Sequence, residues 1–247
     1  MKPLFSIITV CRNAADTILP TIRSVDTQTC RLYEHLIVDG ASTDGTLELL
    51  AQNPSQLRTV ISEPDKGIYD AMNKGLANTS GEYIIFLNAG DSLHSPHTLQ
   101  LYAQAIMDND YPGVVYGHTD IVDAQRRRLG PRHLDAPEEL TLESFSEGML
   151  VCHQAFVALR RIATAFDTRW KYSADYEWCI RCLQHSRRNV HIPAVTVDYL
   201  AEGMTTAHRR RSLWERFRIM CYYYGTARTV RRHLGFIVRA YKRGSIG

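Results

Sequence analysis

One stretch of the chain, Ser62 to Asp91, constrains its fold more than any other. It predicts a short helix over Tyr69–Asn78, a break at Ser80-Gly81, a buried strand over Tyr83–Leu87 and a polar loop that ends at Asp91. A carboxylate just beyond the C-terminal end of a buried parallel strand stands where open α/β sheets bind ligands. The simpler alternative is an ordinary strand exit with a solvated aspartate, but a second loop of the same kind earlier in the chain favours a ligand site.

Short apolar, β-branched runs alternate with helical segments before this stretch, and the connections are short. That alternation is typical of an α/β protein with a doubly wound, mostly parallel central sheet flanked by helices. The strands and helices expected there are residues 5–10, 17–29, 36–39, 46–52 and 57–61.

The pattern continues after the stretch and changes near the C-terminus. Pro193 interrupts the last expected strand, which favours a place at the sheet edge. From Arg211 onward the sequence is helical and amphipathic. We therefore expect a sheet domain over residues 1–206 and a basic helical appendage over residues 207–247. The elements expected in between are a helix at 96–109, a strand at 113–117, a hairpin at 123–135, a strand at 153–159, a helix at 172–185 and a strand at 190–199.

Charge is distributed unevenly along the 247 residues. The net charge is +3, yet residues 209–247 hold ten Arg, one Lys and one Glu, which gives that segment +10 and leaves −7 for the rest. Such a split predicts a basic surface for anionic lipid or nucleic acid. The six cysteines are too sparse for a disulfide scaffold and favour a reduced cytoplasmic setting. Neither a signal peptide nor a transmembrane run of about 18 apolar residues is expected.

Four loops are expected to meet along one rim of the sheet: Val10–Asn13, Asp39–Gly45, Asp65–Asp70 and Asn88–Asp91. Their chemistry is acidic with two lysines, and oxygen ligands around a diphosphate suit a hard cation such as Mg²⁺ or Mn²⁺. A Gly-x-Gly-x-x-Gly fingerprint and a Walker P-loop are both missing, which argues against a dinucleotide oxidoreductase and a P-loop NTPase. The rim therefore predicts a nucleoside diphosphate bound through a metal bridge.

The residues of these loops carry a resemblance to a known family. The blocks are TVxRN, VDGxSxDGT, EPDxGIYDAMNKGxxxxxGEYxxFLNxGD, HQAxF and SxDY, spread over about residues 4–206. In combination they resemble family 2 of the glycosyltransferases, and most of all the branch found in bacterial colanic-acid and exopolysaccharide gene clusters. The resemblance implies the GT-A fold, a UDP- or GDP-linked sugar donor, a divalent cation and inversion at the anomeric carbon.

The resemblance also implies the residues that hold the donor. Asp39 would accept a hydrogen bond from the base, although a helix-capping role is the alternative. Asp91 would bind the metal, with His208 as a second candidate, while Asn88 and Gly90 replace carboxylates that the family usually has. Lys66 and Lys74 would supply cations to the phosphates unless both are simply solvated. The full donor set is Thr9, Val10, Arg12, Asn13, Asp39, Gly40, Lys66, Gly67, Asp70, Asn73, Lys74, Asn88, Ala89 and Gln154.

Asp175 stands at the position of the family's catalytic base. An inverting transfer needs a carboxylate that takes the proton of the attacking hydroxyl. The alternatives are that Asp175 only caps the following helix, or that Glu177 is the base; Glu177 is otherwise expected to face solvent or to pair with Arg181. His153 would lie beside the donor sugar and acceptor, with a purely structural role as its alternative.

The basic, aromatic tail predicts contact with an anionic membrane surface, against the alternative of a helix packed on the sheet domain. The sequence thus favours a peripheral enzyme at the inner face of the cytoplasmic membrane that glycosylates a lipid-linked oligosaccharide. No nucleic-acid partner is expected, and a homo-oligomer is compatible with the sequence. The competing functions are a non-catalytic sugar-nucleotide-binding protein and a sugar nucleotidyltransferase. Cys179-x-x-Cys182 lacks a second pair and does not predict zinc.

Overall fold

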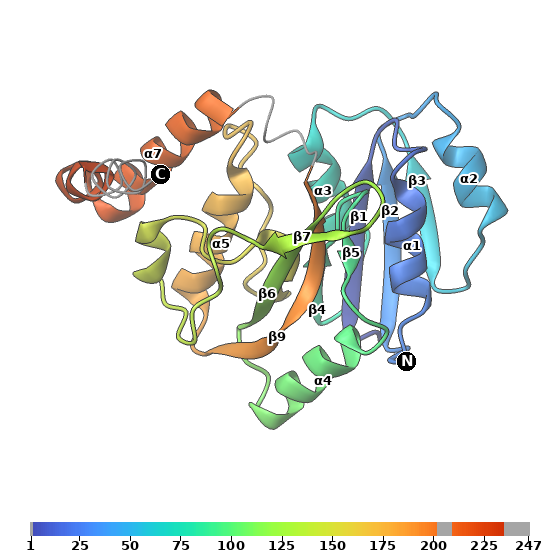
Figure 1. Cartoon of the computed structure of the whole chain (residues 1–247), viewed down its shortest axis with the longest axis horizontal. Coiled ribbons are helices and arrows are strands. Elements are labelled where there is room, and N and C mark those ends of the chain that lie inside the picture. The colour runs from blue at the N-terminus through green and yellow to red at the C-terminus, as the bar shows by residue number, and fades with distance from the viewer. Residues whose placement is uncertain (1, 202–208, 235–247) are drawn as a thin grey trace.

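Buried strands alternate with helices along the first half of the chain, as the sequence predicts. The computed structural model describes residues 2–201 and 209–234 (Figure 1). The elements of the first half are β1 (Phe5–Cys11), α1 (Ile18–Asp26), β2 (Tyr33–Asp39), α2 (Thr46–Gln52), β3 (Arg58–Ser62), α3 (Ile68–Ala77), β4 (Tyr83–Phe86), β5 (Ser92–Leu93) and α4 (Thr98–Asp108).

The second half is less regular. Its elements are β6 (Val114–Val122), β7 (Arg128–Pro131), the 3₁₀ turns η1 (Ser144–Glu147) and η2 (His153–Ala155), β8 (Phe156–Leu159), α5 (Ala174–His185), β9 (Asn189–Leu200) and α7 (Arg209–Tyr224). Residues 226–234 are also helical.

These strands form one nine-stranded sheet in the order β3-β2-β1-β4-β8-β6-β9-β5, with β7 paired to β6. The pairs β3–β2, β2–β1, β1–β4 and β6–β9 are parallel, whereas β8 runs antiparallel to both of its neighbours. The expected α/β class with a mostly parallel sheet is confirmed. Because β1, β2 and β4 are parallel, the loops that follow them leave the sheet at one edge.

One expectation for the second half needs correction, and a second holds for part of a strand. The residues expected as a strand from His153 begin instead as the 3₁₀ turn η2, and pairing starts at Phe156. The last strand, β9, pairs on its outer side with β5 only at Val197 and Asp198, so among the described strands only β6 lies beside it at Pro193, as expected of an edge. Pro193 is accommodated there by a shift in the β6–β9 register between Ile192 and Val195, where the ladder does not need its missing N–H.

The C-terminal helix α7 packs against α5, at the opposite end of the molecule from α2 and β3 (Figure 1). Ile219 and Met220 of α7 belong to the same buried core as β1 and β4. The alternative of a helix packed on the domain is therefore confirmed for α7, whose other face still exposes Leu213, Trp214 and Tyr222. Among the residues that the structure describes, no helix is long and apolar enough to cross a membrane.

Candidate active site

The loops that follow β1, β2 and β3 meet at the carboxyl edge of the sheet. Gly40 is packed so closely that a Cβ there would lie 2.3 Å from Asp65 Oδ2 and 3.3 Å from the Arg12 side chain. Asn13, with a φ of 49°, donates its N–H to the Ser42 hydroxyl at 2.7 Å and accepts the Thr43 N–H on Oδ1 at 3.0 Å. The predicted rim is therefore present, and a side chain at Gly40 would have to displace the Asp65 carboxylate.

Asp39 is fully buried at the end of β2, and both of its oxygens are occupied. Oδ2 accepts the Ser42 N–H at 2.9 Å and the Ser62 hydroxyl at 2.7 Å. Burial alone would raise the pKa of Asp39, but these hydrogen bonds outweigh it and lower the pKa. The capping alternative for Asp39 is wrong, because Asp44 accepts the Thr46 N–H at 3.1 Å at the start of α2.

The Asp65–Asp70 loop is a tight turn that leads into α3. Gly67 has a φ of 125°, its N–H donates to Asp65 Oδ1 at 2.9 Å, and the Lys66 N–H donates to Asp70 Oδ2 at 3.0 Å. The ammonium of Lys66 is exposed and forms no ion pair within the described chain. Lys74, in contrast, pairs with Glu63 at 2.8 Å, so the two lysines differ in their availability to a ligand.

Several predicted donor residues point into the protein interior. Thr9 is fully buried, and its hydroxyl lies 2.9 Å from Nε2 of His35 within the sheet. Asn73 uses both ends of its amide on the Phe166 backbone, at 2.7 and 3.0 Å. Val10 is also buried, and its carbonyl accepts the Ala89 N–H at 3.3 Å. These side chains therefore support the rim loops from the protein interior.

The turn after β4 places Asn88 and Asp91 close together, since the Asp91 N–H donates to the Asn88 carbonyl at 3.0 Å. Asp91 is 4% exposed, and its carboxylate accepts the Gln154 amide at 2.6 Å and the Leu200 N–H at 3.0 Å. Burial raises its pKa to about 6 despite these bonds. The Oδ1 atom of Asn88 is buried and meets no hydrogen-bond donor among the described residues.

A chain of polar contacts crosses the site and ends at Asp175. His153 lies with Nε2 at 3.4 Å from the Asn88 amide nitrogen and with Nδ1 at 3.3 Å from Asp175 Oδ2. Tyr69 of α3 donates its hydroxyl to Asp175 Oδ1 at 3.0 Å. The adjacent Gln154 reaches Asp91, so the dipeptide His153-Gln154 connects the two carboxylates that the sequence singled out.

Asp175 is the second residue of α5, and Ser173, not Asp175, is the N-cap. Asp175 therefore does not occupy the N-cap position, although the Tyr176 N–H of the first turn is among its hydrogen-bond partners. Burial would raise the pKa of Asp175, but the hydrogen bond and charge of His153, with the charge of Arg216, lower it to about 2. Glu177 is buried and paired with Arg181 at 2.8 Å, as expected in one of its two alternatives, and does not face solvent.

Some residues near Asp175 in the structure were not predicted from the sequence. Tyr69 lies within the GIYDAMNKG block, yet its contact with Asp175 joins residues 106 positions apart. Glu215 and Arg216 of α7 lie near the start of α5. The sequence could have pointed to Glu215, because it is the lone acid among residues 209–247. His208, the second metal candidate, lies outside the described residues.

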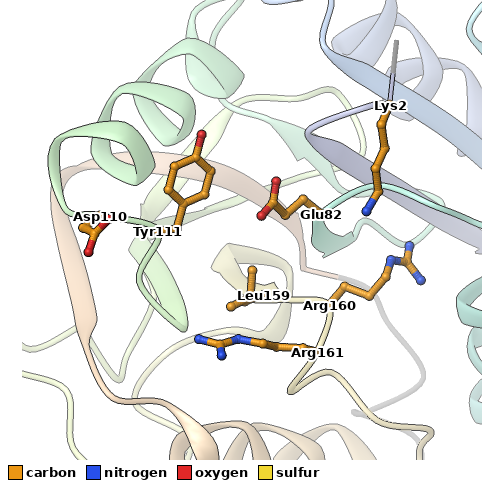
Figure 2. A pocket seen from close by; sticks show the side chains of 7 residues that line it. All are labelled: Lys2, Glu82, Asp110, Tyr111, Leu159, Arg160 and Arg161. Carbon is orange, nitrogen blue, oxygen red and sulfur yellow. The ribbon is translucent and has the colours of Figure 1, made fainter.

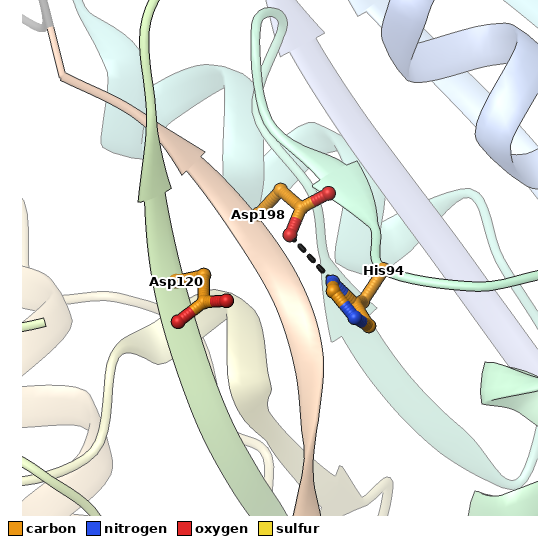
Figure 3. Close-up of side chains that lie close together, drawn as sticks. All are labelled: His94, Asp120 and Asp198. Carbon is orange, nitrogen blue, oxygen red and sulfur yellow. Dashed lines mark hydrogen bonds and ion pairs between the residues drawn. The ribbon is translucent and has the colours of Figure 1, made fainter. Parts of the chain in front are cut away.

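Two further polar groupings are present, and the first lies close to the turn after β4, because Asp198 pairs in register with Ser92 and Arg126 contacts both Gly90 and Asp198. His94, Asp120 and Asp198 converge (Figure 3), but Asp120 is paired with Arg128, and Asp198 with His94 at 2.7 Å. A hollow of about 480 Å³ lies at the opposite end of β4, where Arg160 hydrogen-bonds the Leu76 carbonyl at 3.2 Å and the Thr79 hydroxyl at 3.0 Å (Figure 2). Ion pairs thus engage both aspartates of the first grouping, and backbone and hydroxyl oxygens engage Arg160 in the second.

Comparison with known proteins identifies the family. The sequence profile described as Glycosyl transferase family 2 matches residues 6–165. A PGL/p-HBAD biosynthesis glycosyltransferase of Mycobacterium bovis is 31% identical over 204 residues, which cover 80% of this chain and 74% of that protein. A putative teichuronic acid biosynthesis glycosyltransferase, TuaG of Bacillus subtilis, is 31% identical over 61% of this chain and 60% of its own length.

Two solved structures share the fold. S. aureus TarS 1–349 in complex with UDP-GlcNAc superposes with a TM-score of 0.75 at 18% identity, covering 96% of this chain and 73% of that one. The mannosyltransferase PcManGT from Pyrobaculum calidifontis, in complex with GDP-Man and Mn²⁺, has a TM-score of 0.62 at 17% identity, covering 96% and 76%. The chain thus belongs to glycosyl transferase family 2 and is a nucleotide-sugar-dependent glycosyltransferase with the GT-A fold.

Proposed function

We propose that this enzyme transfers one sugar, with inversion at the anomeric carbon, from a UDP- or GDP-linked donor to a hydroxyl of a lipid-linked oligosaccharide. The product would be part of a bacterial cell-surface glycan, as the names of the mycobacterial and Bacillus relatives suggest. The observation that carries the proposal is the contact chain from Asn88 through His153 to Asp175. It places an ionised carboxylate next to the turn where the donor's phosphates are expected.

Asp175 is the proposed general base. Its lowered pKa keeps it ionised at any physiological pH, so it can accept the proton of an attacking hydroxyl as the new bond forms. Tyr69 and His153 each contact one of its oxygens, which fixes the direction of the carboxylate. Each carboxylate oxygen can accept more than one hydrogen bond, so an acceptor hydroxyl can join these partners.

The donor is proposed to lie across the rim, with its nucleoside near Asp39 and its diphosphate near Asn88 and Asp91. Arg12 and Lys66 are the cations that support this placement, because both are exposed and neither is in an ion pair within the described chain. Gly40 and Gly67 keep the rim free of side chains at the turns that a phosphate would approach.

The turn after β4 suits a divalent cation that is bound mainly by the donor's phosphates. It offers Asp91 and the orphaned Oδ1 of Asn88, and Mg²⁺-like ions often take only one or two protein ligands beside substrate oxygens. When bound, such a cation neutralises charge that develops on the departing diphosphate. Gln154 and the Leu200 N–H hold Asp91 in place at this turn.

The decisive test replaces Asp175 by Asn, which keeps the shape of the side chain but cannot accept a proton. We expect turnover to fall about 10²-fold or more, the scale of a lost general base, while the sugar nucleotide binds normally. Turnover is read as release of UDP or GDP from UDP-GlcNAc, GDP-mannose and related donors with water as acceptor, and binding as a shift in melting temperature. Near-normal turnover by this variant would remove Asp175 from the mechanism.

A further inference from the structure

The C-terminal helix α7 contacts the segment that carries the proposed base. The two carboxylate oxygens of Glu215 accept three consecutive backbone N–H groups, from Lys171 at 3.0 Å, Tyr172 at 2.7 Å and Ser173 at 3.1 Å. Backbone N–H groups just before a helix carry partial positive charge, and a carboxylate is the strongest acceptor they can meet. Glu215 therefore fixes the entry into α5, two residues before Asp175.

The N-cap residue of α5 confirms how closely the two helices depend on each other. Ser173 makes no side-chain bond to its own helix, although serine is a favoured capping residue. Its hydroxyl instead donates to the Ser212 carbonyl of α7 at 3.1 Å and lies 3.0 Å from the Ser212 hydroxyl. Both serines are buried, so the start of α5 is held from α7 and not by its own cap.

A second contact lies on the other side of the base. Tyr223 of α7 donates its hydroxyl to Glu177 Oε1 at 2.6 Å, and Glu177 is buried. Ile219 and Met220 are buried between these two polar contacts. α7 thus forms hydrogen bonds on both sides of Asp175, with residues 171–173 just before α5 and with residue 177 within it.

The neighbour of Glu215 adds charge to the same place. Arg216 is partly buried, and its Nε atom is buried without an acceptor among the described residues. Its positive charge is one of the causes that lower the pKa of Asp175. One turn of α7 therefore provides both an anion for the start of α5 and a cation beside its first turn.

We propose that Glu215 is a positioning residue for the general base, and that α7 is part of the catalytic machinery and not a detachable appendage. The inference rests on the proposed role of Asp175. Without Glu215, three N–H groups lose their acceptor and the start of α5 can shift. A displacement of about 1 Å in a reacting group is enough to cost up to about 10²-fold in rate.

The test is a double-mutant cycle with Glu215→Ala and Asp175→Asn in the full chain. Turnover is measured as release of UDP or GDP from the sugar nucleotide that stabilises the protein most, with water as acceptor. We expect Glu215→Ala to lower kcat about 10- to 100-fold with little change in the KM for the donor. In the Asp175→Asn background the same change should cost little more, because Glu215 acts through Asp175.

The conservative variant and a control separate positioning from general damage. Glu215→Gln keeps an oxygen acceptor, so its kcat should lie between those of Glu215→Ala and the unmodified enzyme. If Glu215→Ala does not fold, Glu215→Gln takes its place in the double-mutant cycle. Glu48→Ala, at an exposed glutamate of α2, should leave kcat unchanged. Hydrogen exchange should rise at residues 171–176 in Glu215→Ala and stay unchanged at residues 46–52.

The outcomes distinguish this proposal from the proposed function. Near-normal turnover in Asp175→Asn would overturn the role of the base, and the positioning role with it. A slow Asp175→Asn beside an unaffected Glu215→Ala would overturn only the positioning role. If the losses of kcat in the two single variants multiply in the double variant, the positioning role is overturned. Unchanged hydrogen exchange at residues 171–176 in Glu215→Ala would also overturn it.

Discussion

Single residues inside the sheet carry charge states that the fold determines. His35 is buried in β2 beside the Thr9 hydroxyl, and its Nδ1 finds no partner within the described chain. Burial, with a smaller contribution from the charge of Arg58, lowers its pKa to about 3. The folded protein therefore keeps this imidazole neutral at pH values where the unfolded chain protonates it.

That difference makes His35 a source of acid sensitivity. Its folded pKa lies below its unfolded value of about 6.5, so its contribution to stability is complete above that pH and is lost as the pH falls toward 3. We expect the free energy of unfolding to fall by up to about 1.4 kcal/mol per pH unit from this group. Thr9→Val/His35→Leu should flatten the pH dependence measured by urea unfolding. His185→Leu, at an exposed histidine, is the control, and an unchanged slope in the double variant would contradict the prediction.

The residues of the site were predictable where they stand at strand ends or in a contiguous motif. Asp91 could be selected because it follows a strand that the apolar pattern predicts, whereas the roles of Asp39 and Asp175 came from the resemblance of their motifs to the family. Tyr69 could not be selected, because its hydroxyl meets Asp175 only after segments 106 positions apart in the sequence have come together. Thr9 and Asn73 fall in the right segments, but a sequence does not say which way a side chain turns.

Elements follow the same division between local and long-range causes. α2 spans Thr46–Gln52 as predicted, since its boundaries are encoded by Asp44 and by the residues of its own turns. Pro193 predicted the open side of β9 where it stands, but the pairing of Val197 and Asp198 with β5 was not predictable, because β5 is a two-residue strand about a hundred positions away. The contacts of α7 with α5 are equally remote in sequence.

The outer face of the C-terminal helices leads to a prediction at the scale of elements. Trp214 is 63% exposed and Tyr222 78% exposed, and Arg210 and Arg231 are also exposed on these helices. We propose that this face lies on anionic lipid at the inner side of the cytoplasmic membrane, close to the acceptor. Aromatic and basic side chains together favour such an interface.

Arg210→Glu/Arg231→Glu should therefore weaken sedimentation with vesicles that contain phosphatidylserine, and added salt should weaken binding of the unmodified protein. Arg161→Glu/Arg187→Glu makes the same change in net charge at exposed positions outside these helices and should bind as the unmodified protein does. Equal loss in both variants would indicate that net charge alone is responsible. Undiminished binding by the first variant would exclude the helices as the contact.

The whole molecule should respond to its donor as a ligand that binds only the folded state. UDP or GDP at a concentration of 100 Kd would stabilise the protein by about 2.7 kcal/mol, which is readily seen as a rise in melting temperature. Mn²⁺ should increase that rise only when the nucleotide is present, because the phosphates supply most of its ligands. Asp91→Ala should lose the metal-dependent part of the rise and keep the remainder, and an intact metal-dependent part would exclude Asp91 as a ligand.

The contacts between α7 and α5 limit where this chain could be recombined with a relative. The family profile ends at residue 165, and the rim loops of the proposed donor site lie before that point, whereas Asp175, α5 and α7 all follow it. Recombination at this boundary would keep the rim loops and exchange the segment that carries Asp175. A crossover between α5 and α7 would instead separate Glu215 and Tyr223 from the backbone and side chain that they bind. The segment from α5 through α7 would therefore have to be exchanged as one block for these contacts to persist.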